Sequence, residues 1–490
     1  MTMSTFKLPV DEKNKATEIR IWDFSRPHMR AFHLDWLAFF FAFFAWFAVN
    51  PLVIYIRISL NLCSNGNWDT FTKASQCKCN LACKTVLANG NILSAVGSIA
   101  MRLVMGTLVE NVGPRRAMAF IVFAFAIPTA GLGLVTTPVG YEACRFFIGG
   151  IGSAFVVCQF WTSIMFSKKV VGAANAIVGG WGNMGGGFTQ IIMPYIVVGL
   201  VALGSYGYGM AWRLSFLIPA SCLVFIGLCL YFSDDVPEGN FKELFASGER
   251  KKQDYKKLFY AAASDPRVWA LCMVYGGCFG SEVSMNQQLA PYFFDYFELN
   301  PEAAGWAAAA VGLSNIFARA LGGMVSDWAN ARFGHRARHW VLFVLMIATS
   351  MFMIGFSRMK NDNLAGAMVL IAFFSVSVSA CNGACYSVVP YIGEHLKALG
   401  PVSGIVGAGG NVGAALWNAI YKYEAGNVDP RAPFFSHGFA ILGCAMLVPF
   451  VHYATLGSCF FPATIKQEEQ PDIAAIKTKA PGIAGITTKV

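Results

Sequence analysis

Long apolar stretches recur along the whole chain, and no other feature constrains its fold as strongly. Twelve stretches of about 19 to 32 residues are each long enough for a helix to cross the ~30 Å hydrocarbon core of a membrane. The predicted spans are 33–57, 91–111, 116–136, 140–164, 171–202, 209–233, 266–294, 301–327, 338–356, 365–390, 399–421 and 434–458. The sequence therefore predicts an all-α membrane protein with twelve transmembrane helices.

The composition also indicates that lipid, rather than water, surrounds most of the chain. Hydrophobic residues make up 56% of it and charged residues only 13%, whereas a soluble domain carries about 25% charged residues. The net charge of +10 comes from basic residues between the spans and not from one basic face, so we expect no nucleic-acid partner. Because the first apolar run is long enough to be a span, we expect no cleaved signal peptide.

Basic residues gather in alternate connections between the spans. With the N-terminus in the cytoplasm, the outside connections 137–139 and 295–300 contain no Lys or Arg. The inside connections contain the clusters Arg115-Arg116, Lys168-Lys169, Arg250-Lys251-Lys252, Lys256-Lys257 and Arg332/Arg336/Arg338. The positive-inside rule therefore places both termini in the cytoplasm.

A polar break divides the predicted spans into two halves of six. We expect a cytoplasmic N-terminal segment at 1–32, an N-terminal half at 33–233, a cytoplasmic linker at 234–265, a C-terminal half at 266–458 and a cytoplasmic tail at 459–490. The tail is polar from about residue 464 onward and is expected to be disordered.

Four of the fourteen cysteines lie in the first external loop, 58–90. They are Cys63, Cys77, Cys79 and Cys83. On the external side of a membrane, disulfide bonds are the expected state of such cysteines, and a small zinc site is the alternative. The other ten lie in or beside the apolar spans and are expected to be packing residues. We predict no metal site and no cofactor.

Two charged segments match each other between the halves. In each, an arginine is followed by glycine four residues on, by a carboxylate eight residues on and then by a basic turn, so the first three share roughly one helix face. The matched residues are Arg102, Gly106, Glu110 and Arg115, and Arg319, Gly323, Asp327 and Arg336. A second match relates 179–186 to 407–414. These matches fall in spans 2 and 8 and in spans 5 and 11, which predicts parallel halves related by an axis along the membrane normal.

Arg102 and Arg319 carry the functional prediction. Each lies eight residues before its carboxylate, which places it ~12 Å deep in a helix. A charge there costs at least ~2.5–3.5 kcal/mol, so two arginines at symmetry-matched positions indicate a function. Guanidinium forks bind planar oxyanions through paired N–H groups, and we predict a central site for a small anion. The alternative is that each arginine pairs with an acid and holds helices together, although Glu110 and Asp327 lie too far along the same helices to do this.

Two further features are better explained by structural roles than by functional ones. Arg145 lies one turn from Glu142, so we expect a structural ion pair there, with a functional role as the alternative. The stretch 180–185 satisfies a dinucleotide-binding fingerprint, but it lies inside an apolar span and not after a strand, so we reject that interpretation. Its glycines should instead allow close helix packing. Asn183 and Asn411 would then donate amide hydrogen bonds to the anion, and a packing role for these asparagines is the alternative.

The segments that carry these residues resemble the nitrate/nitrite porter family of the major facilitator superfamily, and most of all its eukaryotic high-affinity nitrate transporters. The resemblance runs from about Ala31 to about His452 and includes "RLVMGTLVENVGPR", "GGWGNMGGGFTQIIMP", "VYGGCFGSEVSMNQQLAPYFFDYF", "NIFARALGGMVSDW" and "GAGGNVGAALWN". It implies the major facilitator fold, with the substrate arginines at Arg102 and Arg319 and further substrate contacts at Asn183 and Tyr275.

The resemblance also implies a mechanism. Nitrate, with nitrite as a further substrate, is expected to be imported together with protons by alternating access. Exchange of nitrate for nitrite, as implied for bacterial relatives, is the alternative. The glycine–carboxylate–arginine turns resemble the cytoplasmic gating motif of the superfamily, in which Glu110 and Asp327 latch the inward gate. A single-span accessory subunit and a location in the plasma membrane are further implications.

Proton symport needs a group that gains and loses a proton, and Glu282 is the candidate. It lies seven residues after Tyr275, two turns along the same helix face, and an intramembrane carboxylate is a functional candidate by default. A hydrogen-bonded structural glutamate is the alternative. The sequence contains no metalloprotease motif or phosphate-binding loop, so we do not expect an enzyme. A nutrient receptor of the same fold remains open, because only a flux assay separates it from a transporter.

Overall fold

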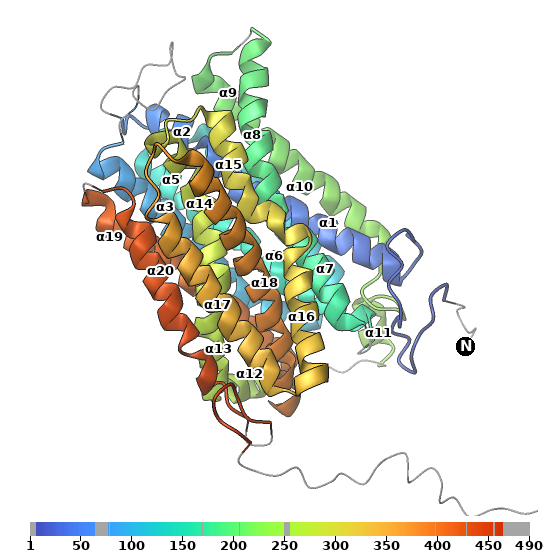
Figure 1. Cartoon of the computed structure of the whole chain (residues 1–490). Coiled ribbons are helices and arrows are strands. Elements are labelled where there is room, and N and C mark those ends of the chain that lie inside the picture. Colours follow the sequence, from blue (N-terminus) through green and yellow to red (C-terminus); the bar gives the residue numbers. More distant parts are fainter. Residues whose placement is uncertain are drawn as a thin grey trace, which may run out of the picture.

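Helices make up most of the chain in the parts that the structure describes (Figure 1). The computed structural model describes residues 6–63, 77, 79–167, 170–204, 206–248, 255–396, 398–427, 429–453 and 456–463. Within these ranges there are isolated bridges but no strands. The clusters Lys168-Lys169 and Arg250-Lys251-Lys252, and the tail from residue 464, lie outside the described residues.

The N-terminal helices form six membrane-length segments, several of which are composite. They are α1 (His28–Phe47) with α2 (Val49–Ser59), α3 (Leu81–Val112), α4 (Pro114–Gly131), α5 (Pro138–Gly149) with α6 (Ala154–Met165), α7 (Val171–Asn183) with α8 (Gly185–Ala202), and α9 (Tyr208–Ser215) with α10 (Leu217–Cys229). Two short helices follow in the polar break, α11 (Phe241–Ala246) and α12 (Tyr255–Ala263).

The C-terminal helices supply six more segments. They are α13 (Pro266–Tyr275) with α14 (Ser281–Tyr296), α15 (Pro301–Leu313) with α16 (Ala318–Phe333), α17 (Arg336–Phe356), α18 (Leu364–Leu396), α19 (Leu399–Tyr423) and α20 (Ala432–Ala445). In the described part of the chain, ten of the twelve segments are long and apolar enough to cross a membrane. The other two, α13–α14 and α19, contain buried polar residues such as Glu282 and Asn418, which lower their hydropathy.

Breaks within the composite segments have local causes and expose backbone groups at mid-depth. Pro51 has no N–H to bond the carbonyl of residue 47, and α1 ends there. A one-turn 3₁₀ segment, Gly150–Ser153, separates α5 from α6, and a π-helical turn, Gly276–Gly280, separates α13 from α14. Inside a membrane such breaks occur where the backbone is buried by neighbouring helices or borders a site.

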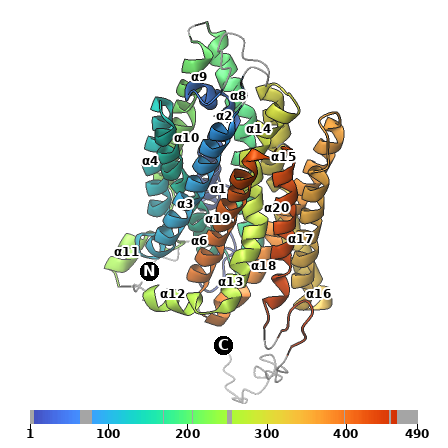
Figure 2. The same ribbon diagram turned by 90° about the vertical axis from the view of Figure 1, so that its left-hand side faces the viewer.

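The long helices α3 and α19 lie side by side and antiparallel, joining the N-terminal to the C-terminal helices (Figure 2). Their facing residues keep nearly one register from end to end, because most steps along α3 are matched by an equal step back along the chain at α19. The facing pairs are Lys84 with Ala425, Asn91 with Asn418, Ser98 with Asn411, Arg102 with Gly407, and Glu110 with Gly400. A second seam joins α7–α8 to α15–α16.

The two ends of the bundle differ in what they carry. One end holds the cysteine-containing connection between α2 and α3 and is called the disulfide end here. The opposite end holds α11 and α12 and is called the α12 end (Figure 2). Arg102 lies near the middle of the α3–α19 seam, between these two ends.

Candidate functional site

Arg102 and Arg319 lie close together in the core, although Arg102 belongs to the N-terminal helices and Arg319 to the C-terminal helices. Each guanidinium lies over the same two aromatic rings. The Cζ of Arg102 is 5.2 Å from the centroid of Phe155 and 5.3 Å from that of Phe279, and the Cζ of Arg319 is 5.5 Å and 6.0 Å from the same centroids. Both arginines are buried. Two like charges this close in a dry core repel each other, so the arrangement favours a negative guest.

Neutral acceptors hold Arg102. Its Nε donates to the carbonyl of Gly152, 3.0 Å away, which the break between α5 and α6 exposes, and its Nη1 donates to the carbonyl of Gly407. With the Asn411 amide turned so that its oxygen faces donors, that oxygen accepts from Nε and Nη1 of Arg102, each at 3.0 Å, and from Ser98. These contacts fix the guanidinium without neutralising its charge.

One nitrogen of the Arg319 guanidinium has no hydrogen-bond partner in the described structure. Its Nη2 donates to the hydroxyl of Tyr275 at 3.1 Å, whereas its Nη1 is buried and makes no hydrogen bond within the described structure. A buried charged donor without a partner costs about 1–3 kcal/mol or more. Nη1 can therefore donate to an anion beside Arg102.

Aromatic side chains line the space around the two arginines. Only one of them, Tyr275, is predicted from the sequence. Tyr275 stacks on Phe279 with centroids 5.3 Å apart, and the ring of Tyr386 meets Tyr275 at 4.9 Å and Phe155 at 5.4 Å. Phe279 lies one turn after Tyr275 on the same face, so helical spacing could have indicated it. Phe155 and Tyr386 lie in long apolar runs, where no pattern distinguishes them. The two arginines and these four rings are called the arginine site below.

The glycine-rich stretches make the close contacts that their composition predicts. Each stretch makes them with the opposite half of the protein. Gly179 and Gly180 on α7 face Arg319: a Cβ on Gly180 would lie 2.5 Å from the carbonyl oxygen of Asn315 and 3.7 Å from the Arg319 Cβ. Gly407 on α19 faces Arg102, and a Cβ there would lie 3.7 Å from Nη1. The glycine stretch of each half thus packs against the arginine of the other half.

With this geometry established, comparison with known proteins identifies the family. Residues 36–417 match the Major Facilitator Superfamily. The High affinity nitrate transporter 2.5 of Arabidopsis thaliana is 36% identical over 95% of this chain and 88% of its own length. The Nitrate transporter 2.2 of Chlamydomonas reinhardtii is 36% identical over 92% of this chain and 85% of its own length. The chain belongs to the nitrate/nitrite porter family of the major facilitator superfamily.

More distant proteins agree with this assignment. The Nitrate/nitrite transporter NrtP of Nostoc punctiforme is 26% identical over 89% of the chain and 94% of its own length. The crystal structure of a D-xylose-proton symporter matches the porter with a TM-score of 0.63 and 12% identity, over 86% of this chain and 97% of the other. At that identity the match supports the fold alone. The relatives found are transporters and not enzymes.

The side chains of the two asparagines predicted to bind the anion make hydrogen bonds to other groups of the protein. The Nδ2 of Asn183 donates to the carbonyl of Gly179 at 2.7 Å, one turn back in its own helix, and its Oδ1 is buried without a partner. Asn411 uses its oxygen to orient Arg102. Asn411 thus lies beside the arginine site, and its binding of the anion stays a prediction.

Glu282 makes the contacts of a structural glutamate. Its Oε1 accepts from the Asn315 amide at 2.7 Å and its Oε2 from the Asn382 amide at 2.5 Å. These bonds connect α14, the turn Ser314–Ile316 and α18, and the Glu282 carboxylate acts electrostatically on Arg319. The contacts fit the alternative explanation given above for this residue and leave its role in proton coupling as a proposal.

Asp327 pairs with a different arginine from the one that belongs to its motif, Arg336. Asp327 forms an ion pair with Arg338, Oδ1 to Nη1 at 2.6 Å, whereas Arg336 donates to the carbonyls of Ser458 and Cys459. Residues 336 and 338 lie two apart at the start of α17 and so point to nearly opposite helix faces. Only Arg338 faces α16, because α17 begins at Arg336 directly after the turn.

The N-terminal counterpart of this motif is built differently. Arg115 uses its backbone N–H to donate to Asp235 at 2.9 Å and its side chain to reach the carbonyl of Tyr231. The carboxylate of Glu110 lies against Gly400 near the start of α19, where a Cβ would come 2.7 Å from it. Gly106 is buried in α3, and a Cβ on Gly323 would make an ordinary contact of 3.9 Å with the carbonyl oxygen of Gly383. Glu110 therefore contacts the opposite half at the α12 end.

The expected ion pair of Arg145 with Glu142 is also absent from the described contacts. The Nη2 of Arg145 donates to Oδ1 of Asn91 at 2.7 Å, and Oε1 of Glu142 accepts from Asn89 at 2.9 Å. Both asparagines lie on α3, so long-range packing provides partners that the local spacing does not indicate. Arg145 has a structural role between α5 and α3, but with different partners from those predicted.

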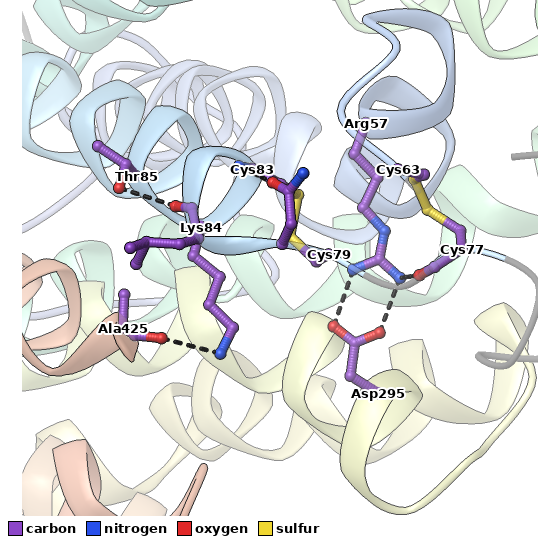
Figure 3. The surroundings of a disulfide bond; sticks show 11 residues. Arg57, Cys63, Cys77, Cys79, Cys83, Lys84, Thr85, Asp295 and Ala425 are labelled. Atoms are coloured by element: carbon purple, nitrogen blue, oxygen red, sulfur yellow. Dashed lines mark hydrogen bonds and ion pairs between the residues drawn. A yellow bond between two sulfur atoms is a disulfide. The ribbon is translucent and has the colours of Figure 1, made fainter. Parts of the chain in front are cut away.

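The four loop cysteines are paired at the disulfide end, Cys63 with Cys77 and Cys79 with Cys83, as Figure 3 shows. Within the described chain, no cluster of His, Cys, Asp or Glu could hold a metal ion. Each disulfide lies beside a contact between the two sets of helices. Arg57 forms two hydrogen bonds to Asp295, at 2.7 and 2.8 Å, and Lys84 donates to the carbonyl of Ala425 at 3.0 Å. These contacts border a cavity of about 150 Å³ at the disulfide end.

Proposed function

We propose that this protein is a secondary active transporter that imports nitrate, with nitrite as the alternative or additional substrate, through the arginine site. The observation that carries the proposal is the unpartnered, buried Nη1 of Arg319 beside an Arg102 that only neutral acceptors hold. The choice of anion is supported by the relatives, which are named as nitrate transporters and as nitrate/nitrite transporters.

The chemistry of the site suits a flat, singly charged oxyanion. Guanidinium groups donate paired N–H bonds in one plane, and the aromatic rings favour a planar guest between them. In the state in which Glu282 is ionised, the two arginines, Glu282 and one monovalent anion sum to zero charge. A divalent anion such as sulfate would leave an excess negative charge in the core, which selects against it. Tyr275 and Asn183 are proposed to complete the substrate contacts.

Alternating access is proposed as the mechanism, and contacts at the two ends of the seams between the halves, 33–233 and 266–458, support it. At the α12 end Glu110 contacts the start of α19, and at the disulfide end Arg57 contacts Asp295. Opening one end requires breaking one set of contacts while the other holds, and the arginine site lies between them. By the positive-inside rule the α12 end is proposed to face the cytoplasm, with both termini, and the protein to reside in the plasma membrane.

Proton symport is proposed as the driving force, with Glu282 as the coupling group that the sequence indicates. Exchange of nitrate for nitrite is the second mode, and a single-span accessory subunit is a proposed partner. A receptor that binds nitrate without moving it has the same site. Flux alone separates these functions.

Uptake of labelled nitrate by vesicles containing the purified full-length chain tests the proposal. We expect accumulation when the outside is acidic, and competition by nitrite and chlorate but not by sulfate. Arg102→Ala and Arg319→Ala should reduce uptake to the level of protein-free vesicles, whereas Arg358→Ala, which removes an exposed arginine at the end of α17, should not. Full uptake by either site variant contradicts the proposal. Nitrate binding without flux in the parent protein indicates the receptor.

A further inference from the structure

A second carboxylate lies inside the bundle, and no part of the proposed site uses it. Asp35 on α1 is 1% exposed. Its Oδ2 accepts a hydrogen bond of 3.0 Å from the hydroxyl of Thr162 on α6, and its Oδ1 is buried without a hydrogen-bond partner. Among the hydrogen bonds and ion pairs of the described chain, none joins Asp35 to a basic residue.

Glu282 and Asp35 have opposite surroundings. Glu282 has an amide donor on each oxygen and a counter-charge in Arg319. Asp35 has one hydroxyl, the nearby thiol of Cys158 and no counter-charge. An ionised carboxylate there keeps one oxygen without a hydrogen bond, whereas a carboxylic acid has an O–H of its own to donate. The geometry suits a group that holds an exchangeable proton.

The elements packed against α1 bring few other titratable groups. Such groups on these elements are Cys158 on α6, Cys222 and Cys229 on α10, Arg115 and Arg116 on α4, Tyr195 on α8, and Tyr55 and Arg57 on α2, while α7 has none. From the N-terminal segment, Lys15 reaches the carbonyl of Ser163. On α1 itself, His28 and His33 bond the carbonyls of Asn14 and Asp23. Of all these, Cys158 is the group that contacts the Asp35 carboxylate.

Asp35 is mechanically connected to the arginine site. Thr162 lies seven residues after Phe155 on α6, which places it ~10 Å further towards the α12 end. One turn after Asp35, Phe39 packs on Phe155 with centroids 5.9 Å apart and fills the space over Gly182. A movement of α1 against α6 therefore changes both the surroundings of Asp35 and the wall of the arginine site.

We propose that Asp35 carries the proton that is co-transported with the anion. This inference rests on the proposed function, because it concerns the coupling ion of that transport. The neutral acid forms by taking a proton from water on the external side, and the carboxylate re-forms by releasing that proton to water on the cytoplasmic side. In this scheme Asp35 takes the coupling role for which the sequence indicates Glu282, and Glu282 serves instead as the counter-charge of Arg319.

The experiment compares two transport modes of the full-length protein in vesicles. Exchange of labelled for unlabelled nitrate at equal pH needs no net proton movement, whereas accumulation against a gradient needs the proton. Asp35→Asn should keep nitrate exchange and lose accumulation driven by an acidic outside. Asp35→Glu should restore accumulation in part, and Glu282→Gln should weaken both modes because the charge balance at Arg319 changes.

The outcomes separate this inference from the proposed function. Absence of nitrate flux in the parent protein overturns the proposed function. Nitrate flux that ignores the pH gradient, or an Asp35→Asn variant that accumulates nitrate like the parent, overturns the inference alone. Loss of both modes by Asp35→Asn also overturns it if the variant still binds nitrate with the parent affinity, because Asp35 then has a structural role in the conformational change.

Discussion

Arg57 on α2 and Asp295 on α14 form a bidentate ion pair that joins the N-terminal to the C-terminal helices at the disulfide end (Figure 3). The Arg57 side chain is fully buried, whereas that of Asp295 is 39% exposed. Nη2 of Arg57 also donates to the carbonyl of Cys77. We propose that the pair holds the disulfide end closed while the α12 end opens.

Removing the acid should weaken this closure. Asp295→Asn leaves Arg57 buried without its counter-charge, a strongly unfavourable arrangement. We expect a lower melting temperature and slower net nitrate uptake. Asp362→Asn, which changes an exposed aspartate in the connection after α17, is the matched control and should alter neither. Parent-like stability and uptake in Asp295→Asn would show that the pair plays no part in closure.

The two disulfides should contribute unequally to stability. The bond Cys63–Cys77 closes a 14-residue separation and is worth about 3 kcal/mol in the chain-entropy estimate, whereas Cys79–Cys83, with a separation of 4, is worth about 2 kcal/mol. Replacing the first pair by serine also releases the Cys77 carbonyl from Arg57. We expect the first double variant to lower the melting temperature more than the second, and the reverse order would contradict this role of the Cys63–Cys77 loop.

The glycines that face the arginines should tolerate no side chain. In Gly180→Ala the new methyl group would overlap the carbonyl oxygen of Asn315, a backbone atom that cannot move alone, so α7 and α16 must separate. Overpacking of this kind costs about 1–3 kcal/mol. We expect uptake to fall sharply. Gly172→Ala in the same helix meets nothing within 4 Å and serves as the control. Equal uptake by the two variants would contradict the tight contact.

Much of the fold and part of the site can be predicted from the sequence for physical reasons. Lipid requires long apolar helices, so the spans are visible as hydropathy. Isolated charges inside such spans are rare, so Arg102 and Arg319 stand out, and their matched positions predict that they meet. The structure brings them together over the same two rings.

What the sequence does not predict depends on direction and on distant contacts. Arg336 and Arg338 are equivalent by composition, and only the start of α17 decides which one faces Asp327. The partner of Arg145 comes from α3, far away in the sequence. Phe155 is one of many aromatic residues in apolar runs, and its role depends on the break before α6 that turns this helix towards the arginines.

The hydroxyl of Tyr275 should affect substrate affinity more than stability. Tyr275→Phe removes the acceptor of Arg319 Nη2, so the guanidinium loses the bond that orients it towards the anion. Hydrogen bonds to charged groups contribute about 1.5–3 kcal/mol, which corresponds to at least about tenfold in KM for nitrate. Tyr423→Phe, at a tyrosine that is 92% exposed, is the control. An unchanged KM in Tyr275→Phe would show that this bond does not orient Arg319.

A lysine at either arginine position tests whether geometry or charge binds the anion. Arg102→Lys and Arg319→Lys keep one positive charge each, but an ammonium group lacks the planar fork and cannot hold two in-plane bonds to one oxyanion. In Arg102→Lys the carbonyls of Gly152 and Gly407 would also compete for the single nitrogen. We expect both variants to remain in the membrane and to lose most uptake at low nitrate concentration, with partial recovery at high concentration. Parent-like uptake by either lysine variant would mean that charge alone suffices and that paired hydrogen bonding is not what selects the substrate.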